Sequence, residues 1–247
     1  MKKSVLLSGL LAGIPALLLS RRKNKPRYDE SRVARNLHRL APTRGRGMDP
    51  EQASCRFLMY GLLPFWFVPG VLDWLWHRQT KIETTAGIKE SLIHVLMMTE
   101  VGVPILLGLF FETNAGMLAL MTGASVIHQA TAIWDVSSTV RARKIPPREQ
   151  HTHTFTESLP FMATAFLACL HPNQFLALFG KGPEEPRFGL ELRRPPLPPS
   201  YTASILAAVA VFVALPYGEE LLRCWRAKQK GLAGRDIPRC ARELYAA

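Results

Sequence analysis

Residues 88–111 read IKESLIHVLMMTEVGVPILLGLFF, an apolar run with few charged residues. A stretch of about 20 apolar residues spans the hydrocarbon core of a bilayer as an α-helix, which satisfies its own backbone hydrogen bonds in lipid. Four other stretches are comparable: 57–76, 115–134, 155–176 and 201–217. The sequence therefore predicts an all-α fold, a polytopic integral membrane helical bundle with about five or six apolar segments when residues 1–20 are included.

The composition alone does not separate this chain from a soluble protein, because 48% of its 247 residues are hydrophobic and 20% are charged. The arrangement of the charges is more informative. The net charge is +12, and eleven Lys and Arg residues lie between Arg21 and Arg56, outside the apolar runs. This pattern indicates membrane topology and contact with anionic lipid headgroups. We expect no nucleic-acid partner.

The composition divides the chain into three parts. Residues 1–56 combine a hydrophobic anchor with a basic arm, residues 57–218 form the membrane bundle with a metal site, and residues 219–247 form a basic cytoplasmic tail. Residues 1–20 have the charged start and apolar run of a secretory signal, but no A-x-A cleavage site follows them. An uncleaved anchor is the favoured interpretation, and cleavage is the alternative.

Two prolines in the first apolar run bear on the orientation. Pro64 and Pro69, in PFWFVPG, can break a helix, so residues 57–76 are interpreted as a re-entrant segment, with a full span as the alternative. Re-entry places the basic arm, the basic loops and the tail on one cytoplasmic face. The expected location is a bacterial inner membrane, with the functional site on its cytoplasmic side.

Acids and histidines gather at the ends of four segments. They are Asp73 and His77, Glu90 and His94, His128 and Asp135, and finally His151, His153 and Glu157. Short loops make neighbouring helices antiparallel, so these four ends should lie on the same side of the membrane. Most pairs are four residues apart and one pair is seven apart, spacings that place both members on one helix face. The sequence therefore predicts one layer of imidazoles and carboxylates.

This set of side chains predicts metal binding. Imidazoles and carboxylates together suit iron, manganese or zinc, and the absence of nearby thiols argues against an iron–sulfur centre. The nine residues are enough for two metal ions, which we expect to be iron, with zinc as the alternative. In this hypothesis the five histidines bind the metals, the four acids bridge the metals or orient the imidazoles, and Glu90 and Glu157 are the catalytic candidates.

The design resembles, over residues 73–157, integral-membrane di-iron hydroxylases and desaturases, whose histidines cluster at the cytosolic ends of membrane helices. The chain departs from that family because the H-x-x-x-H and H-x-x-H-H signatures are missing. The resemblance implies an oxygenase that hydroxylates or desaturates a lipid or another apolar substrate. A separate reductase would have to donate the electrons, because the sequence has no flavin or haem motif.

Three other functions are compatible with the same residues. A zinc-dependent membrane lipid hydrolase would use a carboxylate such as Glu157 as its base. A non-enzymatic transporter or proton relay requires a polar path across the membrane, yet the far halves of the helices carry almost nothing ionisable. A structural membrane scaffold would use each histidine only as a hydrogen-bond partner between helices. Because the ionisable residues gather at one end of the helices and not along them, the sequence favours chemistry at one membrane surface.

Overall fold

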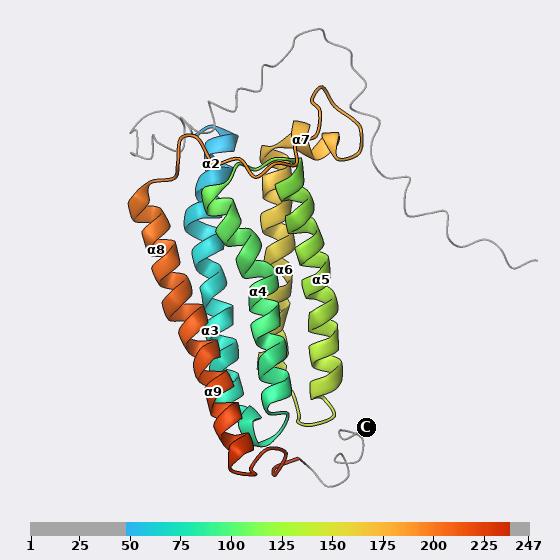
Figure 1. Ribbon diagram of the computed structural model, residues 1–247, viewed down its shortest axis with the longest axis vertical. Helices are drawn as coiled ribbons and strands as arrows, with labels where there is room; N and C mark the ends of the chain where they lie inside the picture. Colours follow the sequence, from blue (N-terminus) through green and yellow to red (C-terminus); the bar gives the residue numbers. More distant parts are fainter. Residues whose placement is uncertain (1–47, 238–247) are drawn as a thin grey trace, which may run out of the picture. The chain divides into compact units, whose positions relative to one another are not determined.

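A computed structural model describes residues 48–237, which form a bundle of helices (Figure 1). The long helices are α3 (Leu63–Thr80), α4 (Ile88–Phe110), α5 (Ala115–Thr139) and α6 (Pro147–Leu170). The shorter elements are α2 (Pro50–Arg56), η1 (Phe57–Leu62), η2 (Ile82–Thr84), α7 (Pro172–Ala177), α8 (Pro199–Val209), η3 (Ala210–Ala214) and α9 (Leu215–Gln229). No β-strand occurs within residues 48–237, so the all-α prediction is confirmed. The predicted anchor and most of the basic arm, up to residue 47, lie outside the described residues.

Consecutive long helices run antiparallel. α4 packs against α5 and α9, while α6 packs against α3 and α5. One end of the bundle therefore collects the C-terminal ends of α3, α5 and α9 and the N-terminal ends of α4 and α6 (Figure 1). This is the end at which the sequence places the acids and histidines.

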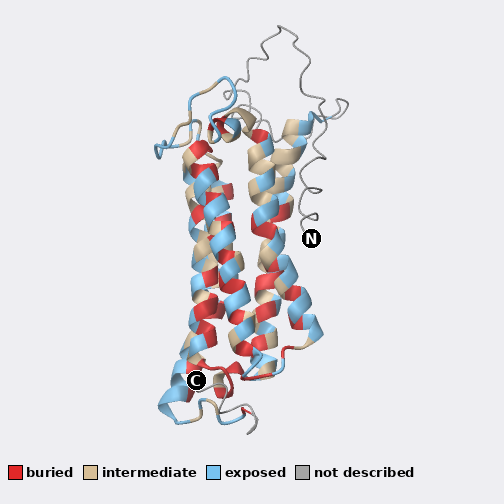
Figure 2. Cartoon of the chain, turned by 90° about the vertical axis from the view of Figure 1, so that its right-hand side faces the viewer, coloured by how far each residue is buried: buried red, intermediate tan, exposed pale blue. Residues whose placement is uncertain are grey.

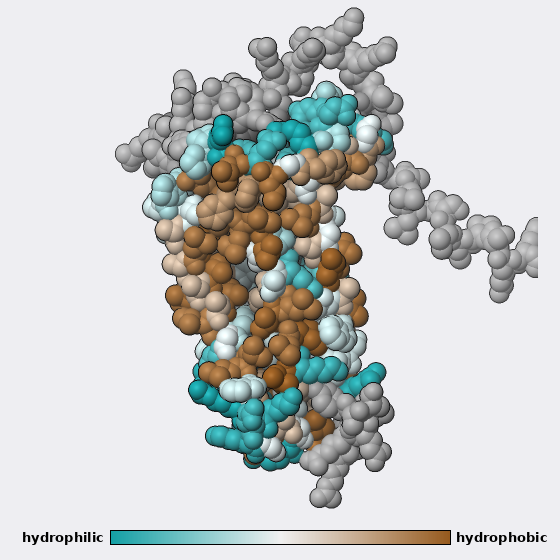
Figure 3. Space-filling model, in the orientation of Figure 1, coloured by the Kyte–Doolittle hydropathy of each residue, from teal (hydrophilic) through white to brown (hydrophobic). Residues whose placement is uncertain are grey.

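Four helices are long and apolar enough to cross a membrane: Pro50–Thr80, Ile88–Phe110, Ala115–Thr139 and Pro199–Gln229. Large apolar side chains face outward from them, such as Ile133 and Leu215, which are 61% and 65% exposed. Figure 3 shows that apolar residues cover most of one face of the bundle, with polar residues toward both ends, and Figure 2 shows buried positions alternating with exposed ones along the helices. The exposed apolar surface indicates a multi-pass membrane protein.

The first helix corrects the interpretation of its two prolines. Helical structure continues from Pro50 to Thr80 without a reversal, so residues 57–76 are not re-entrant. The π-helical turns of η1 end immediately before α3, and Pro64 is the second residue of α3. A wide turn at this position accommodates a residue that has no backbone N–H. Pro69 lies inside α3 without ending it.

The last helix extends beyond the boundary expected for the tail. α9 continues to Gln229, and its buried positions include Tyr217, Glu220 and Cys224, which recur every three or four residues. That spacing forms one face of a helix, and this face packs against α4. The expected domain boundaries at 56/57 and 218/219 therefore both fall inside helices.

An extended segment, residues 183–198 between α7 and α8, lies alongside the turn between α4 and α5 at the opposite end of the bundle. We call it the strap. The backbone N–H of Gly116 donates to the Arg187 carbonyl over 2.9 Å, and the Asn114 side chain donates to the Gly189 carbonyl over 2.7 Å. A Cβ atom on Gly116 would lie only 2.9 Å from Phe188 Cα. The strap therefore packs closely against the start of α5 only because residue 116 is glycine.

This contact predicts the effect of adding one methyl group. Gly116→Ala should destabilise the protein by about 1–3 kcal/mol, because backbone atoms of the strap must move. Gly123→Ala is the matched control on the same helix, since a Cβ atom there meets nothing within 4 Å. The control should be neutral or stabilise the helix by up to about 1 kcal/mol. Denaturant titration of the detergent-solubilised protein measures both, and equal midpoints for the two variants would refute the prediction.

Candidate metal centre

Eight ionisable side chains from five helices meet in one layer near the end that collects the N-termini of α4 and α6. They are Asp73 and His77 on α3, Glu90 and His94 on α4, Asp135 on α5, Glu149 and His153 on α6, and Glu220 on α9. All except His153 are buried, and His153 is mostly covered. We call this set the histidine–carboxylate layer. Such a concentration of buried ionisable groups requires compensation by opposite charges.

Two stacked imidazoles lie at the centre of the layer. The rings of His77 and His94 are 4.3 Å apart and inclined by 7°. Glu220 lies beside both rings, with His77 Nδ1 at 2.8 Å from Oε2 and His94 Nδ1 at 3.0 Å from Oε1. A carboxylate only accepts hydrogen bonds, so Nδ1 carries the proton in both rings. Carboxylates of this kind hold metal-binding histidines in many proteins by fixing the tautomer that leaves Nε2 free.

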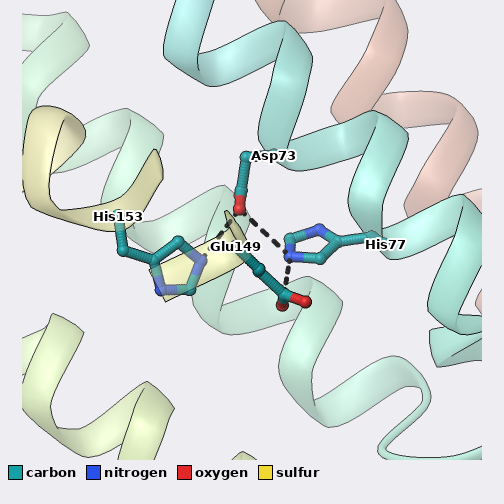
Figure 4. Close-up of side chains that lie close together, drawn as sticks. All are labelled: Asp73, His77, Glu149 and His153. Carbon is teal, nitrogen blue, oxygen red and sulfur yellow. Dashed lines mark hydrogen bonds and ion pairs between the residues drawn. The ribbon is translucent and has the colours of Figure 1, made fainter. Parts of the chain in front are cut away.

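The Nε2 atom of His77 faces two acids: Asp73, one turn earlier on α3, and Glu149 on α6 (Figure 4). It lies 3.3 Å from Asp73 Oδ1 and 3.5 Å from Glu149 Oε1, and it has no hydrogen bond. Asp73 Oδ1 also lies 2.8 Å from His153 Nε2. Ligand atoms of these four residues all lie within 4.8 Å of one another, so the group could hold a metal ion.

The Nε2 atom of His94 faces a separate pair of acids. It lies 3.5 Å from Asp135 Oδ2 and 3.9 Å from Glu90 Oε1, again without a hydrogen bond. Oδ1 of Asp135 has no hydrogen bond either. Ligand atoms of His77, Glu90 and His94 also lie within 4.8 Å of one another, so these three residues form a second grouping that could hold a metal ion, and His77 is common to both groupings.

An arginine joins the two groups. Arg143 lies in the turn between α5 and α6 and is only 6% exposed. Its Nε donates to Glu90 Oε2 over 3.2 Å, its Nη1 donates to Glu149 Oε2 over 3.0 Å, and its Nη2 contacts both carboxylates. Burial alone would lower the pKa of Arg143, but hydrogen bonds and charge from Glu149 and Glu90 raise it above its usual value. Arg143 therefore stays charged and partly neutralises the layer.

The structure brings six of the nine predicted residues together: Asp73, His77, Glu90, His94, Asp135 and His153. His128, His151 and Glu157 lie elsewhere. His128 is two turns from Asp135, roughly 10 Å along α5, and its Nδ1 lies 3.5 Å from Glu100 Oε2. Glu157 accepts a hydrogen bond from Gln129, and the exposed His151 packs edge-on against Phe155.

Two residues of the layer, and the arginine that joins its two groups, were not predicted as part of the site. Glu149 precedes His153 by four residues, so the helical spacing used for the other pairs would have found it. Glu220 belongs to the segment interpreted as a tail, although its neighbours Tyr217 and Cys224 continue a buried helical stripe. Arg143 was interpreted as a topology signal together with the neighbouring basic residues. Nothing in its sequence context distinguishes it from the exposed Arg141.

Removing the arginine should expose its role in stability. Arg143→Met leaves Glu90 and Glu149 buried without their cation, so we expect a loss of about 3–5 kcal/mol in the free energy of unfolding. Arg141→Met, at an exposed position two residues earlier, should change stability little. Denaturant titration in the presence of a chelator measures both without interference from added metal. Equal midpoints for the two variants would contradict this role for Arg143.

The layer thus combines two groups of nitrogen and oxygen ligands that share His77, a common carboxylate behind both imidazoles, and one internal cation. An imidazole nitrogen without a proton and a carboxylate oxygen are both acceptors, so each contact at Nε2 requires a proton or a metal ion between them. No family model matches the sequence, and no curated protein or solved structure matches it significantly.

Proposed function

We propose that this chain is an integral membrane metalloenzyme with two metal ions in the histidine–carboxylate layer, and that it oxidises a lipid or another apolar substrate. One observation carries the proposal. The two stacked imidazoles turn Nδ1 toward Glu220 and turn their unbonded Nε2 atoms toward two separate groups of acids. This is the arrangement expected when each Nε2 binds its own ion and the carboxylate behind the rings orients both.

Protonation is a weaker explanation than metal binding for these contacts. Protons on both Nε2 atoms would place two positive rings face to face at 4.3 Å. Like charges at this separation repel each other strongly in a buried site. Metal ions held by the Nε2 atoms and the facing carboxylates would satisfy the same nitrogen atoms and leave the rings neutral.

The charge balance also supports two ions. The layer contains five buried carboxylates, on Asp73, Glu90, Asp135, Glu149 and Glu220, and Arg143 adds one buried guanidinium. With neutral imidazoles the formal charge is −4, which two divalent cations cancel. Without such cations, protonated imidazoles of His77, His94 and His153 would have to balance the carboxylates, which places two positive rings face to face.

The ligand set favours iron or manganese over soft metals. All candidate ligand atoms are imidazole nitrogens or carboxylate oxygens, and no thiol belongs to either group. Helical bundles that hold two iron ions use similar carboxylate and histidine ligands from four helices. Bound iron would supply activation of O2, and the protein would supply the buried site, the orientation of the ligands and access for an apolar substrate from the bilayer.

A cytoplasmic position of the layer is part of the proposal, because a soluble or membrane-bound reductase on that side could reach it with electrons.

Elemental analysis of the purified protein tests the proposal. The wild type should bind about two iron or manganese ions per chain. His77→Ala and His94→Ala should each lose most of the bound metal, because each removes an imidazole ligand. His128→Ala is the matched control, since His128 is equally buried but lies outside the layer, and it should retain the metal.

The possible results separate the alternatives. Zinc at a similar stoichiometry, without near-ultraviolet absorption, would replace oxidation with a zinc-dependent hydrolysis. Full metal content in both His77→Ala and His94→Ala would refute the proposed metal centre.

A second experiment tests the role of Glu220 behind the rings. Glu220→Gln keeps the size of the side chain but weakens the acceptor for both Nδ1 protons, so metal affinity should fall about 10- to 100-fold. Glu219→Gln is the matched control, because Glu219 contacts Trp74 and Arg223 and not the histidines. Competition with a chelator of known affinity measures both variants. Equal affinities in the two would show that Glu220 does not orient the ligands.

A further inference from the structure

An apolar cavity of about 170 Å³ lies in the half of the bundle away from the histidine–carboxylate layer. It is half open and is lined by η1, α3, α4, α5, α6 and the start of α8, with side chains such as Leu62, Val101, Met121 and Leu167 in its walls. Along α6 it extends from Pro160 to Leu170, roughly 15 Å of helix. An apolar space that extends this far along the bundle can accommodate a hydrocarbon chain.

One end of the cavity carries a partly buried positive charge. Arg193, from the strap, lines this end, and its Nη2 donates to the carbonyls of Gly108 and Phe111 over 3.1 and 3.3 Å. Its Nε is buried without a hydrogen-bond partner, and Arg193 forms no ion pair with any residue of the described range 48–237. Burial lowers the pKa of Arg193 although the charge of Glu112 opposes this. An anion bound beside this guanidinium would compensate a positive charge that is partly removed from water and would accept a hydrogen bond from its free N–H.

A second polar group lines the same end. His171 lies between α6 and α7, and burial, with the charges of Arg193 and Arg187, lowers its pKa to about 4. The imidazole is therefore neutral at pH 7 and can donate one hydrogen bond to a ligand beside Arg193. The cavity thus has one cationic end with a neutral donor and is apolar along the rest of its length.

We propose that this cavity binds one hydrocarbon chain of an anionic amphiphile, with the acidic head against Arg193 and the chain between α4, α5 and α6. The carboxylate of a free fatty acid and the phosphate of a phospholipid share this chemistry. The inner end of the cavity reaches Ser125 on α5, about 15 Å along the helix from Asp135, so the chain points toward the histidine–carboxylate layer without reaching it. Only the identification of this ligand as the substrate rests on the proposed function, and the binding itself does not.

Binding of straight-chain carboxylates and the matching alcohols to the delipidated full-length protein in a non-ionic detergent tests the proposal. The carboxylate affinity should rise roughly four-fold per added methylene until the chain fills the cavity. Arg193→Gln should weaken carboxylate binding by more than roughly ten-fold and leave alcohol binding unchanged, because it removes only the charged partner. Arg194→Gln is the matched control at an exposed neighbouring position and should bind both ligands like the wild type.

Two further variants keep the test decisive if Arg193→Gln does not fold. Arg193→Lys retains the charge and should retain most of the carboxylate preference over the alcohol. Ala163→Phe fills the cavity from α6 and should abolish binding of both ligands. Unchanged carboxylate affinity in Arg193→Gln, or unchanged binding of both ligands in Ala163→Phe, would overturn the proposal.

A competition arm identifies the source of the anion. Displacement of a bound carboxylate by phosphatidic acid, dependent on Arg193, assigns the site to a phospholipid, and failure to displace it assigns the site to a free fatty acid. All measurements are made with and without a chelator. Loss of chain binding with metal content intact overturns only this inference, whereas absence of metal with chain binding intact overturns only the proposed function.

Discussion

Burial of five carboxylates in one layer of an apolar bundle is the constraint on which the arrangement of the other groups depends. The acids repel one another, and the helices that carry them can pack only if cations are placed between them. The chain provides one such cation, Arg143, and fixes it between Glu90 and Glu149. It also turns two stacked imidazoles so that one edge of each ring faces Glu220 and the other faces the remaining acids. The geometry of the layer therefore follows from its need for positive charge.

Much of this arrangement is accessible from the sequence. The lengths of the apolar runs indicate membrane-crossing helices, and short loops force neighbouring helices to run antiparallel. Pairs such as Glu90 and His94, four residues apart on α4, then fall on one face at one end of the bundle. Helical periodicity and loop length are local properties, which is why the sequence reveals the layer before any tertiary contact is known.

The sequence says less about how far along the bundle each side chain lies and which way it faces. His128 and Asp135 share a face of α5, but two turns separate them along the helix axis, so only Asp135 reaches the layer. His151 and His153 are adjacent in depth, yet residues two apart point to different sides of a helix, and His151 is exposed. Glu220 and Arg143 depend on long-range packing of α9 and of the turn after α5. A spacing rule identifies neighbours within one helix and does not identify which side chains from other helices meet them.

The position of Glu220 on the final helix has a consequence for biosynthesis. The carboxylate that holds both central imidazoles comes from α9, whereas the imidazoles come from α3 and α4, more than a hundred residues earlier in the chain. A ribosome releases these parts in that order, and the early helices enter the lipid before their last partner has been translated. The layer reaches its final geometry only after α9 has docked, so any ion that it holds would be bound only at the end of assembly, once the whole bundle has formed.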